Sequence, residues 1–243
     1  GTAIVTAAGV INALHLTKRD IKNTTFVCNG AGAASIACVE LLKAMGAQSQ
    51  NVILVDREGV IFRGRQTNMN QWKSGHTVET KSRTLEDALK GADVFLGLSV
   101  PGSVSKEMVK NMADKPIIFA MANPIPEIMP EEIKSVRSDA IIATGRSDYP
   151  NQVNNVLGFP YIFRGALDVR ATTINEEMKI AAAKAIASLA REDVPDEVNA
   201  AYHGVQLHYG KDYIIPAPFD PRLISFVSSA VAEAAMDSGV AKK

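Results

Sequence analysis

An excess of charge of one sign is absent from this chain, because 26 lysine and arginine residues balance 26 aspartate and glutamate residues. A chain without a basic patch has no electrostatic attraction to nucleic acid or to an anionic membrane surface, so we expect neither as a partner. The sequence also has no apolar run of about 18 residues and no basic and then apolar leader. It therefore predicts no transmembrane helix and no signal peptide.

Cysteine is scarce as well. Cys28, in a predicted strand, and Cys38, in a predicted helix, are the two cysteines of the chain. Buried thiols of this kind are typical of a reducing compartment, which favours a cytoplasmic protein. An initiator methionine is also missing, since the chain begins Gly-Thr-Ala. We therefore expect a fragment of a larger protein.

Apolar residues are plentiful, at 47% of 243 residues, and their spacing alternates between two periods. An opening helix is expected over residues 2–16, with Ile4, Ala7, Ala8, Ile11 and Leu14 on one apolar face. Short apolar runs then alternate with helical patterns, which predicts an α/β fold with a Rossmann-like doubly wound parallel sheet flanked by helices. The expected strands are 24–28, 51–55, 93–99, 116–121 and 140–144, separated by helices that end at Gly46 or span 85–89, 106–112 and 130–135.

Beyond residue 160 the pattern changes to long helices. One is expected over 174–190, and another is expected to be capped by Asp220, to start at Pro221 and to end at Gly239. We interpret residues 1–243 as a single cofactor-binding domain. Its core is placed at 20–160 and its helical C-terminal part at 161–243.

A glycine turn follows the first predicted strand, and the organisation of the sheet centres on it. In Rossmann units such glycines let the backbone approach a pyrophosphate, and the next helix presents its N–H groups to the phosphate. Ser35 stands where the third glycine of the motif is usual, so an ordinary strand-to-helix turn remains an alternative. The turn comprises Gly30, Ala31, Gly32, Ala33, Ala34 and Ser35.

Asp56 ends the second predicted strand, 24 positions after Gly32. An acidic residue at this place in a Rossmann unit accepts hydrogen bonds from the adenosine ribose, although an aspartate that merely opens a turn is the alternative. Arg57 next to it would suit a 2′-phosphate, which the carboxylate of Asp56 would repel. The residues therefore leave the choice of cofactor open between NAD and NADP. The polar stretch 64–82 is expected to be an exposed excursion with one short helix.

Polar residues also collect after the later strands. Asn123 follows the strand at 116–121, and Asn155 ends the polar run that follows the last strand. Asparagine beside proline often only forms a turn, but the carboxyl ends of parallel strands are where such sheets bind ligands. The joint position of these amides favours a ligand site.

With these loops in view, the chain resembles the nicotinamide-cofactor domain of malic enzymes, particularly the bacterial small and hybrid types, over nearly its whole length. The long run from Thr144 is the most specific part of the match. The matching segments are Gly1–Ile4, Gly30–Ala34, Ala122–Pro124, Thr144–Asn155, Phe163–Asp168, Ile214–Pro216 and Pro218–Arg222.

The resemblance implies oxidative decarboxylation of malate to pyruvate and carbon dioxide, with NAD or NADP as hydride acceptor and a divalent Mg²⁺ or Mn²⁺ ion. It also implies that Asn123 and Asn155 position the substrate carboxylates. The cofactor contacts it implies are Gly30, Ala31, Gly32, Ala33, Ala34, Ser35, Asp56, Arg57, Ser99 and Asn123.

In the enzymes that the chain resembles, the tyrosine acid, the lysine base and the acidic metal ligands precede this domain. No catalytic residue and no metal ligand is therefore assigned here, and we expect cofactor binding without catalysis by this chain alone. The expected partners are malate, the missing N-terminal malic domain and further copies of the chain, through the alanine-rich helices or the vacated interface. The main alternative is a Rossmann-shaped regulatory or interaction module without cofactor binding. A weaker one is an enzyme similar to amino-acid dehydrogenases, which would need an internal catalytic lysine.

Overall fold

The computed structural model describes residues 1–242, which form two compact units. The sheet unit comprises Thr17–Pro150. The helical unit comprises Gly1–Leu16 together with the chain from Asn151 onward. Within the described residues, no helix combines the length and the apolar character needed to cross a membrane.

Six strands make the sheet of the sheet unit, in the order β3-β2-β1-β4-β5-β6. Five of them are parallel, which confirms the predicted doubly wound α/β sheet. The two-residue β3 pairs antiparallel with β2 and was not predicted, because so short a segment has no period to detect. The strands are β1 (Phe26–Asn29), β2 (Val52–Asp56), β3 (Gly59–Val60), β4 (Val94–Gly97), β5 (Ile117–Ala120) and β6 (Ile141–Thr144).

The central strands are buried on both faces, as continuous apolar runs in a parallel sheet should be. Every residue of β1, β4 and β5 is buried. Their register is even, with Asn29 opposite both Val55 and Gly97, and Gly97 in turn opposite Ala120. All five parallel strands therefore end at the same edge of the sheet, where their following loops collect.

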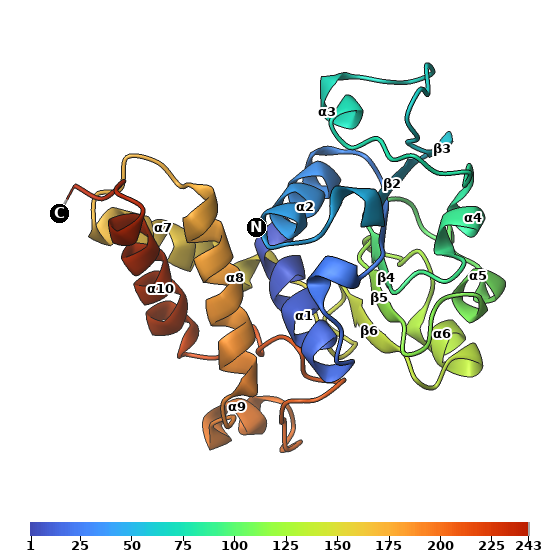
Figure 1. Cartoon of the computed structure of the whole chain (residues 1–243). Helices are drawn as coiled ribbons and strands as arrows, with labels where there is room; N and C mark the ends of the chain where they lie inside the picture. The colour runs from blue at the N-terminus through green and yellow to red at the C-terminus, as the bar shows by residue number, and fades with distance from the viewer. Residues whose placement is uncertain (243) are drawn as a thin grey trace. The chain divides into compact units, whose positions relative to one another are not determined.

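Helices cover both faces of this sheet, with α2 on one side and α4, α5 and α6 on the other (Figure 1). The predicted capping of the 85–89 helix is confirmed, because Thr84 accepts a hydrogen bond from the Asp87 amide in a full capping box. The excursion at 64–82 contains one short helix, α3, as expected. The elements are η1 (Ile21–Asn23), α2 (Ala33–Ala44), η2 (Ser49–Asn51), α3 (Gln71–Ser74), α4 (Leu85–Leu89), α5 (Lys106–Lys110) and α6 (Pro130–Val136).

In the helical unit, α8 lies between α1 and α10 (Figure 1). The predicted span of α1 is confirmed, but the prediction of a single apolar face is wrong. Ile11 is only half-buried, whereas the polar Asn12 is fully buried, and its amide donates to the carbonyls of Ala187 and Ile214, which offsets the cost of removing it from water. The elements are α1 (Thr2–Leu16), η3 (Asn155–Leu157), α7 (Phe159–Asp168), α8 (Glu176–Arg191), α9 (Asp196–Ala201) and α10 (Leu223–Asp237).

The expected start of the last helix is also wrong. The helix α10 begins at Leu223 with Arg222 as its N-cap, two residues later than predicted. The carboxylate of Asp220 is fully buried and accepts hydrogen bonds from the backbone and guanidinium of Arg222, which holds these residues in a preceding turn. The predicted end is confirmed, since Gly239 follows the C-cap with φ 77°.

Candidate functional site

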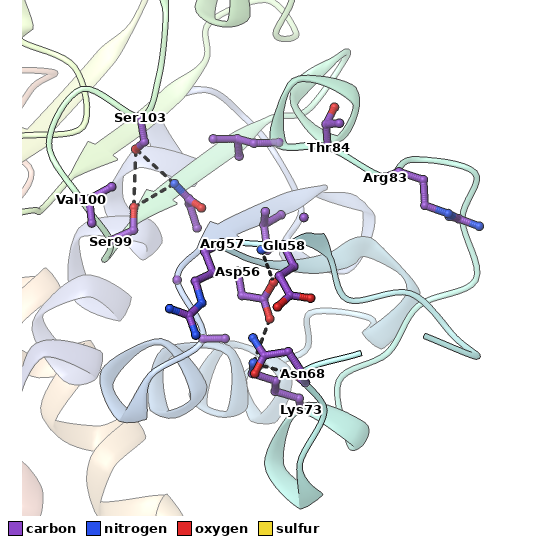
Figure 2. A pocket seen from close by; sticks show the side chains of 16 residues that line it. Asp56, Arg57, Glu58, Asn68, Lys73, Arg83, Thr84, Ser99, Val100 and Ser103 are labelled. Carbon is purple, nitrogen blue, oxygen red and sulfur yellow. Dashed lines mark hydrogen bonds and ion pairs between the residues drawn. The ribbon is translucent and has the colours of Figure 1, made fainter. Parts of the chain in front are cut away.

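A cavity of about 680 Å³ lies within the sheet unit where β1, β2 and β4 end (Figure 2). It brings together five residues that the sequence predicted as cofactor contacts. These are Gly30, Ala31, Asp56, Arg57 and Ser99. The carboxyl ends of three neighbouring strands thus contribute to one concave surface, which is where open α/β sheets bind ligands.

The two glycines of the turn have different reasons to be glycine. Gly30 has φ 117°, and a Cβ built on it would lie 2.5 Å from the carbonyl oxygen of Leu98, so the fold itself requires glycine there. Gly32 has φ −80°, and a Cβ built on it would meet nothing within 4 Å. No internal packing explains this glycine. The open space in front of it fits the close approach of a bound group.

Gly32 is also the N-cap of α2, and no side chain caps this helix. Gly32, Ala33 and Ala34 are all exposed, so the first turn of α2 presents its backbone to solvent. Helix N-termini of this kind attract phosphate through backbone N–H groups and the helix dipole. The residues present therefore fit a dinucleotide pyrophosphate.

Ser35, which replaces the third glycine, points elsewhere. Its side chain is buried, and its Oγ lies 3.0 Å from the position that a Cβ on Gly30 would take. It also hydrogen-bonds the Cys28 thiol, whose pKa burial raises. Ser35 packs the turn against β1, and its role as a cofactor contact remains a prediction. Cys28 and Cys38 are both buried and no disulfide joins them, as expected.

Asp56 is held by three donors from its own unit. Its Oδ2 accepts hydrogen bonds from Arg65 Nη2 at 2.6 Å and from Lys73 Nζ at 2.8 Å, and its Oδ1 accepts from the Glu58 amide at 2.9 Å. Burial raises the pKa of Asp56, but the bonds from Arg65 and Lys73 outweigh it, so the pKa lies below its usual value. Asp56, Arg65 and Lys73 form an ion-pair cluster, and each of the three side chains is less than 10% exposed.

The other charged residues of the cavity differ in what they contact. Arg57 is exposed, and within residues 1–242 its side chain has no hydrogen-bond or ion-pair partner. Glu58 is exposed beside it. Arg83 is already engaged, donating to the carbonyls of Thr80 and Ser82 and stacking on Phe62, and Figure 2 shows it pointing away from Asp56.

The opposite wall of the cavity is neutral. Asn29, at the end of β1, donates to Ser99 Oγ at 2.9 Å and to Ser103 Oγ at 3.2 Å (Figure 2). The backbone amide of Ser99 in turn donates to the carboxylate of Glu127. The position of Ser99 is thus fixed from both its side chain and its backbone.

Glu127 joins two strand ends from inside the sheet unit. Its Oε2 accepts from the Ser99 amide at 3.1 Å, and its Oε1 accepts from the Ala122 amide at 2.9 Å. The residue is fully buried, and burial raises its pKa, which the bonds from Ala122 and Ser99 only partly oppose. Gly97 provides the space, because a Cβ there would lie 2.3 Å from Glu127 Oε2.

The two predicted substrate amides belong to different units. Asn123 lies in the sheet unit, exposed at the end of β5 and followed by a cis peptide bond to Pro124. Asn155 lies in the helical unit, where its Oδ1 accepts from Thr2 Oγ1 at 3.0 Å. Asn151, in the same specific run, is buried and bonded to the backbone of Lys211 and Ile214, so it holds the fold. Substrate positioning by Asn123 and Asn155 remains a prediction.

Sequence reasoning missed the residues that organise this site from a distance. Arg65 and Lys73 lie in the polar excursion that was expected to be exposed, yet both are buried against Asp56. Glu127 was also missed. Its signal was a charged residue between Pro126 and Ile128, in an otherwise apolar stretch where a solvated carboxylate is out of place.

The strand order, the glycine turn and the cavity at the strand ends define a Rossmann-type nucleotide-binding protein. The family model described as "Malic enzyme, NAD binding domain" matches residues 1–202. The chain therefore belongs to the malic enzyme NAD-binding domain family.

Its relatives divide by cofactor. The chain is 67% identical to the NADP-dependent malic enzyme of Rhizobium meliloti and 54% identical to the NAD-dependent malic enzyme of the same organism, covering all of itself and 32% of each relative. It is also similar to the crystal structure of malic enzyme from Pyrococcus horikoshii, with 38% identity and a TM-score of 0.87 over all of this chain and 55% of that one. The chain thus spans about a third to a half of the length of these proteins.

Proposed function

We propose that this chain is the cofactor-binding part of an enzyme that oxidatively decarboxylates malate to pyruvate and carbon dioxide with NAD or NADP. The observation that carries the proposal is Gly32, a glycine that no steric contact within the fold requires, at an N-terminus of α2 that no side chain caps. Family membership supports it independently. When bound, the nicotinamide ring supplies the hydride acceptor.

The chain's own residues would bind and orient the cofactor. The first turn of α2 would receive the pyrophosphate at Gly32, Ala33 and Ala34, and the cavity after β2 would receive the adenosine ribose. Asn123 and Asn155 would position the malate carboxylates with neutral amide donors. Ser99, fixed by Asn29 and Glu127, would line the cofactor path.

We further propose that the acid, the base and the Mg²⁺ or Mn²⁺ ligands are supplied by a preceding malic domain. The chain spans only 32% of the Rhizobium meliloti enzymes, which leaves ample length for such a domain. Within residues 1–242 no group of three or more His, Cys, Asp or Glu side chains is placed to hold a metal ion. The homo-oligomer and the cytoplasmic location remain predictions.

The decisive experiment is calorimetric titration of NADP⁺ and NAD⁺ into the chain and into Gly32→Ala. We expect Gly32→Ala to weaken binding at least about tenfold, because its methyl group occupies the space for the pyrophosphate. Stability should fall by about 1 kcal/mol, since glycine is clearly preferred to alanine at an N-cap, and this leaves the chain folded for the titration.

Two further glycines serve as controls. Gly210→Ala should leave binding unchanged, because its Cβ also meets nothing within 4 Å but it lies in the helical unit. Gly30→Ala should destabilise the fold by about 1–3 kcal/mol through its positive φ and the clash with Leu98. Unaltered binding by Gly32→Ala would contradict the proposal. Failure of the unmodified chain to bind either nucleotide at millimolar concentration would favour the interaction module instead.

Catalysis is tested separately. With malate, Mn²⁺ and either nucleotide, we expect the chain alone to give no turnover. If the acid, the base and the metal ligands lie in a preceding malic domain, addition of a malic domain from a relative should restore turnover. Measurable turnover by the chain alone would show that an acid and a base lie within it.

A further inference from the structure

The ion-pair cluster at the end of β2 bears on which nucleotide the cavity takes. Asp56 stands where a Rossmann carboxylate accepts hydrogen bonds from the ribose hydroxyls. Here Oδ1 is used by the Glu58 amide and Oδ2 by Arg65 and Lys73, and the side chain is only 7% exposed. The carboxylate therefore offers little acceptor capacity to a ligand.

The charge of Asp56 is also compensated. Two buried cations share its Oδ2, so the cluster of Asp56, Arg65 and Lys73 carries a net positive charge. The usual reason why an acidic residue at this position excludes a 2′-phosphate is electrostatic repulsion, and here that repulsion is cancelled from inside the fold.

Arg57 completes the arrangement at the surface of the cavity. Its exposed guanidinium has no partner within the described residues, and it follows Asp56 directly, so it lies at the ribose end of the predicted cofactor path. Glu58 opposes it with one exposed carboxylate. A guanidinium can still bind a phosphate through two parallel hydrogen bonds, which a solvated carboxylate nearby weakens but does not prevent.

We propose that the cavity selects the 2′-phosphate of NADP, with Arg57 as the direct phosphate ligand and Arg65 and Lys73 as the residues that neutralise Asp56. This inference rests on the proposed dinucleotide site and specifies the form of the cofactor. In this proposal the acidic residue after β2 is retained, and the 2′-phosphate is accepted because Arg65 and Lys73 neutralise the charge of Asp56.

The test uses 2′,5′-ADP and 5′-ADP as calorimetric probes, since they differ only in the 2′-phosphate. The unmodified chain should bind 2′,5′-ADP at least about tenfold more tightly than 5′-ADP. Arg57→Gln should reduce this ratio to between one and about three while leaving 5′-ADP affinity unchanged. Arg63→Gln is the matched control, because Arg63 is an exposed arginine that pairs with Glu79 outside the cavity lining, and it should keep the full ratio.

The outcomes separate this inference from the proposed function. Equal affinity for the two probes, with NAD⁺ and NADP⁺ both bound, overturns the 2′-phosphate site and leaves the dinucleotide site intact. Equal weakening of both probes by Arg57→Gln also overturns it, because the arginine would then contact a group that both share. If neither dinucleotide binds, both proposals fail.

Discussion

Two carboxylates at the same edge of the sheet are stabilised in opposite ways. Asp56, after β2, is held by the cationic side chains of Arg65 and Lys73, which more than offset burial and lower its pKa. Glu127, between the ends of β4 and β5, is held by neutral donors, chiefly the backbone amides of Ser99 and Ala122, and burial raises its pKa. The charge of Asp56 is thus compensated by two cationic side chains, whereas the charge of Glu127 is stabilised by neutral donors.

The difference follows from what each carboxylate holds in place. Side chains from a separate excursion reach Asp56, so the surroundings of the cavity can be changed there without altering a strand. Glu127 instead satisfies the N–H groups that follow two adjacent strands, and it fixes Ser99 and the loop that carries Asn123. We infer that the first region determines which ligand is accepted, whereas the second preserves the shape of the binding edge.

The largest expected effect comes from removing the charge that the two cations share. Asp56→Asn should destabilise the sheet unit by about 3–5 kcal/mol, because Arg65 and Lys73 then remain buried without a counter-charge. Urea denaturation measures this. The matched control is Asp148→Asn, which removes the exposed partner of Arg146 and should leave the free energy of unfolding nearly unchanged, because solvent screens this pair. Equal effects of the two substitutions would show that the Asp56 cluster has no special compensating role.

A smaller effect is expected at the space that admits Glu127. Gly97→Ala should cost about 1–3 kcal/mol, because its Cβ would lie 2.3 Å from Glu127 Oε2 and would displace the carboxylate. In a Glu127→Ala background the same methyl group enters a vacated space, so Gly97→Ala should cost much less. A double-mutant cycle measured by urea denaturation reports the coupling. Additive effects would contradict the proposed contact.

The elements of the sheet were predictable because they are encoded by local period and local caps. The parallel strands are short apolar runs, and Thr84 caps its helix through a residue three positions away. The glycine turn could also be recognised from the sequence. Its two glycines could not be told apart by sequence, since the carbonyl of Leu98 that enforces Gly30 comes from a distant loop.

The organisation of the candidate site was not predictable for the same reason. Asp56 and Arg57 were found from their place after a strand, but Arg65 and Lys73 reach Asp56 from 9 and 17 positions away through a segment with no period. The burial of Glu127 depends on a missing side chain at Gly97 on a neighbouring strand. Such complementarity arises when distant segments pack together, so the sequence of any one segment gives little indication of it.

The smallest expected effect is a difference in the pH dependence of stability. Asp56 has a lowered pKa, so its contribution is present above the unfolded value of 3.8 and is lost as pH falls below it. Glu127 has a raised pKa, so its contribution is present below the unfolded value of 4.5 and is lost as pH rises above it.

The unfolding free energy of the unmodified chain minus that of Asp56→Asn should therefore rise with pH in the acidic range. The corresponding difference for Glu127→Gln should fall as pH increases above 4.5. Urea denaturation between about pH 3 and about pH 8 measures both curves. Because the predicted slopes have opposite signs, a general effect of acid on the fold cannot produce both. Slopes of the same sign would mean that the two carboxylates are not stabilised in opposite ways.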